Sequence, residues 1–436
     1  MKRDPDRWLR WWLWGLNLVT LGVGLGWAAL GYRRALFLAV FVPIALAPVS
    51  YARWRAHVAL RSHLPRRPWA SLALAAFAGL GVLCDAIMLA QLLAARSESP
   101  VPVLQAPGVD WIGAVWFSSH ALFLLGLGLG ALAKGAMRGG RRVLRRPVAV
   151  QPDVEERRLF LKQMGVMSVG APFALSLSGV PLSYDFRVEE RDVPLPNWPR
   201  ELDGLRVVHL SDIHVGGAMN RERLLRVAEL TNDARPDVVI HTGDFLTHRA
   251  GDFDLPLYEA LARIRAPNGQ WACLGNHDYD DVQTLVQRLR DAGVVTLRNQ
   301  LITITPGEHP LEIGGLDFTW NRGVRAGAYA SAMADWRPRE GPRLLLNHDP
   351  SGFADLPAGS ADLVCSGHTH GGHIGVQLGR DQALTLVSLL GIPDQGFFEG
   401  RDMRLFVTRC VGFYGYPMRL GIPPEIAVLV LRSAAG

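Results

Sequence analysis

Five short clusters of polar residues, each directly after a run of apolar residues, constrain the fold of this 436-residue chain more than any other feature. They read VVHLSDIH, VVIHTGD, WACLGNHD, LLLNHD and LVCSGHTH. Each apolar run has the length of a buried strand, and amphipathic segments separate the first three runs. This alternation predicts an α/β fold whose strand-end loops converge on one place, because ligand crevices in such sheets form at the carboxyl ends of strands.

The expected elements follow from hydrophobic periodicity and from capping residues. Asn220 is expected to cap the first helix and Gly293 to end the third. The expected helices are 221–232, 255–264 and 282–292, and the expected strands are 206–210, 238–241, 271–274, 311–313, 344–346, 362–365 and 427–431.

The five clusters supply seven candidate metal ligands. These are Asp212, His214, Asp244, Asn276, His348, His368 and His370. Mixed nitrogen and oxygen ligands without sulfur suit manganese, iron or zinc. Seven ligands are too many for one tetrahedral ion, but they suit two divalent ions that share a carboxylate. A pair of metals with a bridging hydroxide is the usual apparatus for in-line attack on phosphorus.

The order of these clusters resembles that of the calcineurin-like metallophosphoesterase superfamily, over about residues 204–431. The ending RLGIPPEIAVLVL is similar to that of bacterial membrane-linked members. The resemblance implies a four-layer sandwich of two mixed β-sheets flanked by helices. It assigns Asp212, His214 and His370 to one metal and Asn276, His348 and His368 to the other. Asp244 would bridge the two metals, and His277 would act as the catalytic residue.

Several further polar residues near the motifs have two interpretations. His373 stands where many relatives have Gln, so it either contacts substrate or caps its loop. His248 either lines the pocket or lies on an exposed loop. Thr247 replaces the acid that orients the catalytic histidine in the phosphatase branch, and this leaves the orientation of His277 open. Asp278 is expected to stabilise a turn, and His209 and His241 are expected in the core or behind the ligands.

The first third of the chain has the composition of a membrane domain. Residues 1–163 carry 21 Lys and Arg against 8 Asp and Glu, whereas the remainder carries 25 against 32. The positive excess therefore lies among apolar segments, which argues against nucleic-acid binding. Four apolar stretches each approach the ~20 residues that cross a bilayer as a helix. They are 11–31, 35–51, 69–95 and 111–133.

Basic residues flank these stretches in a pattern that places both ends of the four-helix unit in the cytoplasm. Arg157 and Arg158 then precede an uncharged segment, which reads either as a twin-arginine export signal or as a fifth transmembrane helix. Both readings place everything after Tyr184 on the outer, periplasmic side of a bacterial inner membrane. Asp85 and His120 lie within apolar stretches and are candidate functional residues or partners in a helix–helix hydrogen bond.

We therefore expect four parts. They are a transmembrane domain (1–150), a twin-arginine-like segment with a fifth apolar helix (151–186), a linker (187–202) and a metallophosphoesterase domain (203–436). The chain has four cysteines and no CxxC spacing, so free buried thiols are expected.

The expected function is hydrolysis of a phosphodiester, phosphomonoester or pyrophosphate, on an envelope or lipid-linked substrate, by a membrane-anchored two-metal enzyme. Two alternatives remain open. One is an enzyme similar to UDP-diacylglucosamine pyrophosphatase that faces the cytoplasm. The other is a metal-binding sensor or adaptor without catalysis.

Overall fold

The computed structural model describes residues 171–172, 174–216, 219–247, 254–336, 341–414 and 418–434, with isolated residues at 115, 119, 122 and 135. The described residues from Gly179 onward belong to one compact unit, and those up to Ser178 belong to a second. The four apolar stretches, the arginine pair, Asp85 and His120 lie outside the described residues. Within the described residues, no helix combines the length and the apolar character that a bilayer crossing requires.

The first β-sheet of the larger unit has six strands and mixed direction. In spatial order its strands are β1 (Arg187–Leu195), β14 (Glu425–Ser433), β2 (Leu205–Leu210), β3 (Val238–Thr242), β4 (Gln270–Cys273) and β5 (Val294–Thr296). Strands β2 to β5 run parallel to one another, and β14 runs antiparallel to β2. The carboxyl ends of β2, β3 and β4 therefore lie at one edge of the sheet.

The second sheet also has six strands and mixed direction. Its strands in spatial order are β12 (Gly396–Gly400), β13 (Met403–Val407), β9 (Leu363–Ser366), β8 (Arg343–Leu346), β7 (Leu311–Gly315) and β6 (Gln300–Ile304). Strands β13, β9, β8 and β7 are parallel. A separate hairpin of β10 (Gly375–Gly379) and β11 (Gln382–Thr385) precedes the short helix α10 (Leu386–Leu389).

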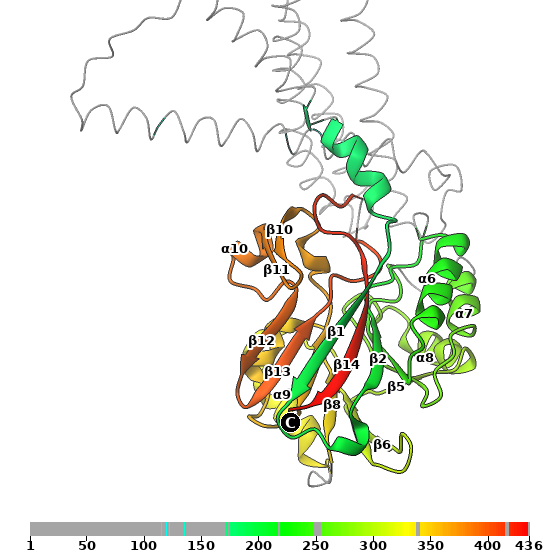
Figure 1. Cartoon of the computed structure of the whole chain (residues 1–436), viewed down its shortest axis with the longest axis vertical. Helices are drawn as coiled ribbons and strands as arrows, with labels where there is room; N and C mark the ends of the chain where they lie inside the picture. The colour runs from blue at the N-terminus through cyan, green and yellow to red at the C-terminus, as the bar shows by residue number, and fades with distance from the viewer. Residues whose placement is uncertain are drawn as a thin grey trace, which may run out of the picture. The chain divides into compact units, whose positions relative to one another are not determined.

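Helices cover the outer faces of both sheets (Figure 1). They are α6 (Arg221–Asp233), α7 (Leu255–Leu261), α8 (Val282–Asp291) and α9 (Arg322–Ala334), and the 3₁₀ turns are η2 (Arg200–Leu202), η4 (Pro350–Asp355) and η5 (His370–Gly372). As predicted, Asn220 caps α6, with its side chain accepting a hydrogen bond from Arg223 N, and Gly293 follows α8 in the left-handed region.

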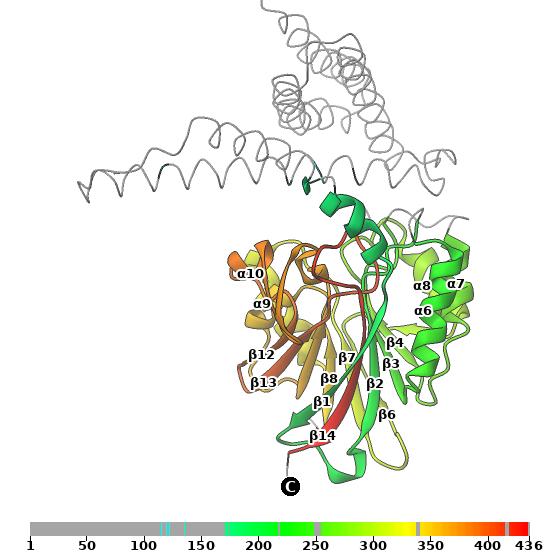
Figure 2. The same ribbon diagram turned by 45° about the horizontal axis from the view of Figure 1, so that its top comes forward.

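Three buried clusters show that the unit has four layers. Val208 of β2 packs with residues of α6, α7 and α8 on the outer face of the first sheet. Its neighbour Val207 points the other way and packs with residues of the second sheet, such as Leu344. Tyr329 of α9 packs against Leu345 on the far face of the second sheet. Figure 2 shows α6–α8 and α9 on opposite sides of the two sheets. The predicted fold of two mixed sheets flanked by helices is thus confirmed.

The segment expected as a linker instead contains a strand. Residues Arg187–Leu195 form β1, which pairs in parallel with β14 along its whole length. The sequence of β1 is polar because it is an edge strand, with one side facing solvent over most of its length. Pro194 is tolerated there because an edge strand need not use every backbone donor. The linker prediction was wrong for these nine residues.

Candidate metal centre

The predicted ligands follow strands of both sheets. Asp212 and His214 come after β2, Asp244 after β3, Asn276 after β4, His348 after β8, and His368 and His370 after β9. The first three strands belong to one sheet and the last two to the other. The side chains that converge are therefore supplied by two sheets whose strand ends meet.

Asp244 lies between histidines from the two sheets. Its Oδ2 is 3.5 Å from Nε2 of His214 and 3.3 Å from Nε2 of His348. Its Oδ1 accepts the backbone N–H of His277 at 2.8 Å. Ligand atoms of Asp212, His214 and Asp244 lie within 4.8 Å of one another, and so do those of Asp244, His348 and His368. One buried carboxylate is thus shared by two groups of potential ligands.

His348 is the centre of one of these groups. Its Nδ1 donates a hydrogen bond to the carbonyl of Thr242 at 2.6 Å, and this fixes the ring. Its Nε2 lies 3.1 Å from Oδ1 of Asn276 and 3.1 Å from Nδ1 of His368. Burial opposes a charge on His348, but the carboxylates of Asp244 and Asp212 raise the pKa of its imidazole to about 10. The electrostatics of this position therefore favour a cation beside Nε2.

Asp212 is the centre of the other group. Its Oδ1 lies 3.3 Å from Nε2 of His370 and 3.9 Å from Nε2 of His214. Nδ1 of His370 donates to the carbonyl of Gly412 at 3.3 Å, which leaves the Nε2 lone pair directed at Asp212. Burial lowers the pKa of both His214 and His370, so both imidazoles are held in the neutral form that binds metal.

Two buried atoms at this position have no hydrogen-bond partner among the described residues: Oδ1 of Asp212 and Nε2 of His214. A buried carboxylate oxygen without a partner costs on the order of 1–3 kcal/mol or more. Both are also atoms that bind divalent metals. The donor set therefore fits a pair of metal ions.

The loops that carry the ligands are held in unusual backbone conformations. Positive φ angles occur at Asp212 (53°), His214 (48°), Asp244 (52°), His368 (67°) and His370 (51°). Non-glycine residues rarely adopt this region, and each such residue costs about 1–3 kcal/mol. Gly367 allows the close approach of two loops, because a Cβ there would collide with Ser211 and with the carboxylate of Asp212.

Asp278 stabilises the loop that carries Asp244, in line with the turn-stabilising role expected for it. Its carboxylate accepts hydrogen bonds from the backbone N–H groups of Asp244, Phe245, Leu246 and Gly275, at 2.8–3.3 Å. Burial and the neighbouring Asp244 raise its pKa to about 7. The side chain fixes the position of Asp244 without facing the metal groups itself.

His277, the predicted catalytic residue, lies at the edge of this centre and is partly exposed. Its ring is 4.6 Å from that of Tyr414 and 5.2 Å from that of His214, between ring centroids. Thr247, which stands in place of the orienting acid, lies with Oγ1 3.4 Å from Nδ1 of His214. Tyr414 is thus the neighbour that packs against the His277 ring, and Thr247 supports a ligand.

Of the two candidate substrate residues, His373 and His248, the structure describes His373. The His373 ring lies perpendicular to that of His370, at 4.7 Å, and its Nε2 is buried without a hydrogen-bond partner. Burial and the nearby Arg419 hold the pKa of His373 well below its usual value. His248, like Asp85 and His120, lies outside the described residues.

Several buried residues support the ligands from behind, and His209 is among them, as the sequence predicts. A buried chain of hydrogen bonds runs from His209 through Thr242 and Ser211 to Oδ2 of Asp212. The guanidinium of Arg419 is fully buried and donates to the carbonyls of His370, Arg409 and Gly412. Ser211 and Thr242 lie within the polar clusters but were not singled out from the sequence, whereas Arg419 belongs to no cluster and only the fold brings it to the site.

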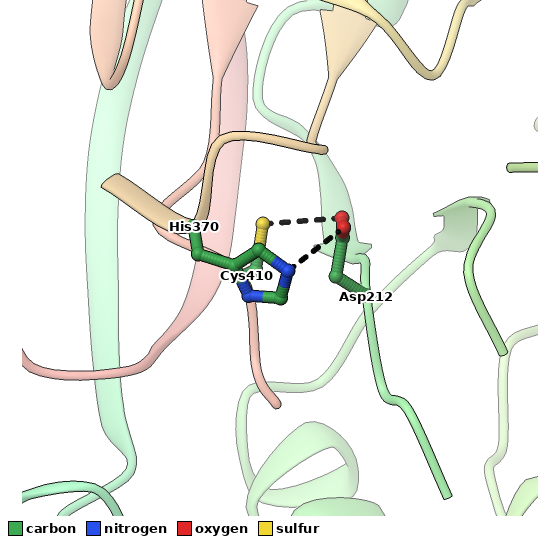
Figure 3. Close-up of side chains that lie close together, drawn as sticks. All are labelled: Asp212, His370 and Cys410. Carbon is green, nitrogen blue, oxygen red and sulfur yellow. Dashed lines mark hydrogen bonds and ion pairs between the residues drawn. The ribbon is translucent and has the colours of Figure 1, made fainter. Parts of the chain in front are cut away.

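Cys410 also borders the candidate ligands, and sequence reasoning did not predict this. Its thiol lies 3.1 Å from Oδ2 of Asp212 (Figure 3). Cys273, Cys365 and Cys410 are all free and buried, as the cysteine count predicts. The sequence offered no signal that one of them borders the ligands.

A two-sheet α/β sandwich with buried and half-buried His, Asp and Asn side chains at its strand ends has the architecture of a metal-dependent hydrolase. The family model for the calcineurin-like phosphoesterases matches residues 205–372. An uncharacterized metallophosphoesterase of Bacillus subtilis, YkoQ, is 30% identical over 51% of this chain and 82% of its own length. The chain belongs to the calcineurin-like metallophosphoesterases, which hydrolyse phosphoester bonds.

Two other relatives carry more specific names. A transmembrane protein with a metallophosphoesterase domain from Danio rerio is 30% identical over 57% of this chain. This chain spans only 58% of that protein's length. The UDP-2,3-diacylglucosamine pyrophosphatase LpxG of Chlamydia muridarum is 24% identical over 55% of this chain and 87% of its own length.

Proposed function

We propose that this chain is a two-metal phosphohydrolase whose seven ligands divide as the family resemblance implies. Asp212, His214 and His370 hold one ion, and Asn276, His348 and His368 hold the other. The observation that carries the proposal is the position of Asp244, whose Oδ2 lies 3.5 Å from His214 and 3.3 Å from His348. A carboxylate so placed is suited to bridge two ions.

Bound at these residues, a pair of divalent ions such as Mn²⁺, Fe²⁺ or Zn²⁺ supplies a nucleophile at neutral pH and neutralises charge on the phosphoryl oxygens. The chain's own contribution is geometric. Thr242 and Gly412 fix the rings of His348 and His370 through their carbonyls. His277 is partly exposed beside the ligands and is placed to donate a proton to the leaving oxygen.

The test compares Asp244→Asn with Asp192→Asn, the same chemical change at an exposed carboxylate that pairs with Arg432. We expect Asp244→Asn to lower kcat on a generic aryl phosphodiester with Mn²⁺ by about 10²-fold or more, because it removes the shared ligand. Asp192→Asn should behave like the wild type. Unchanged turnover in Asp244→Asn contradicts the proposal.

The finer proposal is that the substrate is lipid-linked and is approached at a membrane surface. An apolar surface adjoins the site, because β10 begins two residues after His373. Six of its aliphatic side chains are 49–70% exposed: Val376, Leu378, Leu384, Leu386, Leu389 and Leu390. Figure 1 shows that β10, β11 and α10 lie together. So much exposed aliphatic area in one place is typical of an interaction site.

The charges of this segment favour a bilayer as its partner. Arg380 and Asp381 are the only charged residues between positions 374 and 393. Both bond to β1: Arg380 donates to the carbonyl of Glu190 at 2.9 Å, and Asp381 pairs with Arg191. The aliphatic side chains are thus accompanied by one largely exposed charge, the 58% exposed Arg380, and a basic side chain beside apolar ones is typical of interfacial membrane binding. The four apolar stretches of the sequence and the names of two relatives support the same location.

Activity on two substrates tests this finer proposal. The double variant Leu386→Gln/Leu389→Gln should raise KM for a lipid-linked phosphodiester in liposomes by about tenfold or more, since each leucine loses its transfer into lipid. Its activity on a water-soluble aryl phosphodiester should stay at the wild-type level. Val295→Gln, at an exposed position on β5, is the control. Equal losses on both substrates contradict a lipid-facing role.

The side of the membrane on which the catalytic domain lies distinguishes the two candidate substrate classes. An envelope substrate requires the catalytic domain on the periplasmic side, as the loop charges predict. A UDP-linked lipid of the kind named for the Chlamydia relative would require it in the cytoplasm. A reporter fused after Gly436 decides between them: activity of a periplasm-specific reporter supports the first class, and activity of a cytoplasm-specific reporter supports the second.

A further inference from the structure

Cys410 is held rigidly beside the ligands by its backbone. It lies in the loop after β13, where its N–H donates to Oγ1 of Thr408 at 3.2 Å and its carbonyl accepts from Glu425 N at 2.9 Å. The two residues after it, Val411 and Gly412, donate to the carbonyls of Ser211 and Asp212. The loop is thereby tied to the segment that carries Asp212, so the position of the thiol is fixed relative to that ligand.

The thiol forms a group with two of the proposed metal ligands. Figure 3 shows the sulfur of Cys410 and the imidazole of His370 facing the carboxylate of Asp212. Ligand atoms of these three buried residues lie within 4.8 Å of one another. Aspartate, histidine and cysteine are all ligands of zinc and iron.

A hydrogen bond to Asp212 does not by itself account for the thiol. Oδ2 of Asp212 already accepts the N–H of His368 at 2.9 Å and the hydroxyl of Ser211. Two donors fill the lone pairs of that oxygen, and a thiol is a weak donor. Among the described residues, the other hydrogen bond of the sulfur goes to the carbonyl of Thr408, at 3.5 Å. The thiol is therefore poorly satisfied as a donor.

Independent observations point to a cation at the same place. Oδ1 of Asp212 and Nε2 of His214 are buried without hydrogen-bond partners. Nε2 of His370 lies 3.3 Å from that same Oδ1. A cation at Oδ1 of Asp212 would therefore lie beside these two imidazoles, and the thiol is 3.1 Å from Oδ2 of the same carboxylate.

We propose that Cys410 is an additional ligand of the metal held by Asp212, His214 and His370, an inference that rests on the proposed two-metal function. The metal–sulfur bond forms as the S–H bond breaks, and the proton passes to solvent. A thiolate is a soft ligand, so this position should favour zinc or iron over manganese. The other metal position has no cysteine among its proposed ligands.

The test loads the full-length protein with Co²⁺ and records its absorption spectrum. We expect visible bands from bound Co²⁺ together with a near-ultraviolet sulfur-to-cobalt charge-transfer band. In Cys410→Ser and Cys410→Gly the charge-transfer band should be lost while the visible bands remain. Glycine suits position 410, because the backbone there has φ 64°, so this variant guards against misfolding. Cys365→Ala, which removes a buried core thiol, should keep the band.

X-ray absorption of the zinc-loaded protein gives a second readout. A sulfur shell at about 2.3 Å is expected in the wild type and in Cys365→Ala, and not in Cys410→Gly. Zinc affinity should fall about tenfold or more in Cys410→Gly, with a smaller change for manganese. Visible cobalt bands without a sulfur band overturn the role of Cys410 and leave the two-metal function intact. Absence of all cobalt bands overturns both.

Discussion

Asp278 holds Asp244, the proposed bridging ligand, in place through backbone hydrogen bonds. Its two oxygens satisfy four backbone N–H groups in the loops after β3 and β4. Among these is the N–H of Asp244, so the shared carboxylate depends directly on this side chain. The residue is fully surrounded by protein, and no described side chain substitutes for it as an acceptor at these groups.

Asp278→Asn should lower the free energy of unfolding by about 2–3 kcal/mol, because an amide NH₂ replaces one acceptor oxygen in front of buried N–H groups. The affinity of the variant for metal should also fall, because the position of Asp244 depends on Asp278. Asp281→Asn is the matched control, since Asp281 caps α8 through Thr284 N and asparagine caps helices equally well. Urea unfolding followed by pulse proteolysis measures both variants, and equal stability of the two contradicts this role for Asp278.

The candidate ligands could be proposed from residue types, because each sits directly after a recognisable apolar run. The same reasoning failed for side chains that reach the site from unrecognised elements. Cys410 and Arg419 follow β13, a strand that was not expected, and their neighbours come from β2 and β9. Their roles depend on long-range packing, which no local pattern encodes.

At the scale of elements, a buried charge cluster joins β1, β14 and the loop after β13. Glu425 at the start of β14 lies 2.7 Å from Nη1 of Arg191 on β1 and 3.3 Å from Nη2 of Arg409. The carboxylate also accepts the backbone N–H of Arg409 at 3.1 Å. The cluster therefore fixes the edge strand β1 and the base of the loop that carries Cys410.

Glu425→Gln should destabilise the domain by about 2–3 kcal/mol, because it removes the buried counter-charge that Arg191 and Arg409 share and leaves them only their half-buried partners Asp381 and Glu189. Burial opposes ionisation of Glu425, but Arg409 and Arg191 lower its pKa below the ordinary value of 4.5. Its contribution is then complete above pH 4.5 and is lost as pH falls through the lower folded-state pKa.

The control for Glu425→Gln is Glu259→Gln, at an exposed pair with Arg221 and Arg263. Exposed ion pairs contribute little, so this variant should unfold like the wild type. Pulse proteolysis in urea at pH 7 compares the two. A wild-type midpoint for Glu425→Gln contradicts the structural role of the cluster.

Some helices and strands could be predicted from the sequence and others could not. Strands β2, β3, β4, β8 and β9 were expected within a residue or two of their observed bounds, since each is a buried apolar run. Strand β1 was not expected, because its partner β14 lies more than 200 residues away in the sequence and solvent faces much of it. Helix α9 contains seven glycines and alanines but only three larger apolar residues, so its periodicity is weak.

At the scale of the whole domain, two buried histidines, His209 and His241, contribute to a loss of unfolding free energy in mild acid. Burial lowers the pKa of His209 to about 3 and that of His241 to about 4. Both bind protons near pH 6.5 in the unfolded chain, so the unfolded state takes up more protons as pH falls below 6.5. Stability is therefore complete above pH 6.5 and declines as pH falls toward these lower values.

Between pH 7 and pH 5 the domain should lose about 2 kcal/mol of unfolding free energy for each of these histidines. His241→Gln should remove its share of this pH dependence, because glutamine does not titrate and still reaches the Gln270 side chain. His309→Gln, on a loop outside the core, should keep the wild-type profile. An identical pH dependence in wild type and His241→Gln contradicts the assignment.

Metal content is the most direct measure of whether the seven side chains form one centre. Full-length protein purified with excess Mn²⁺ or Zn²⁺ and then desalted should retain two ions per chain by mass spectrometry. Asp244→Asn should retain fewer than two, while Asp192→Asn should match the wild type. A wild-type chain that retains no metal, or an Asp244→Asn variant that still retains two ions, contradicts the shared centre.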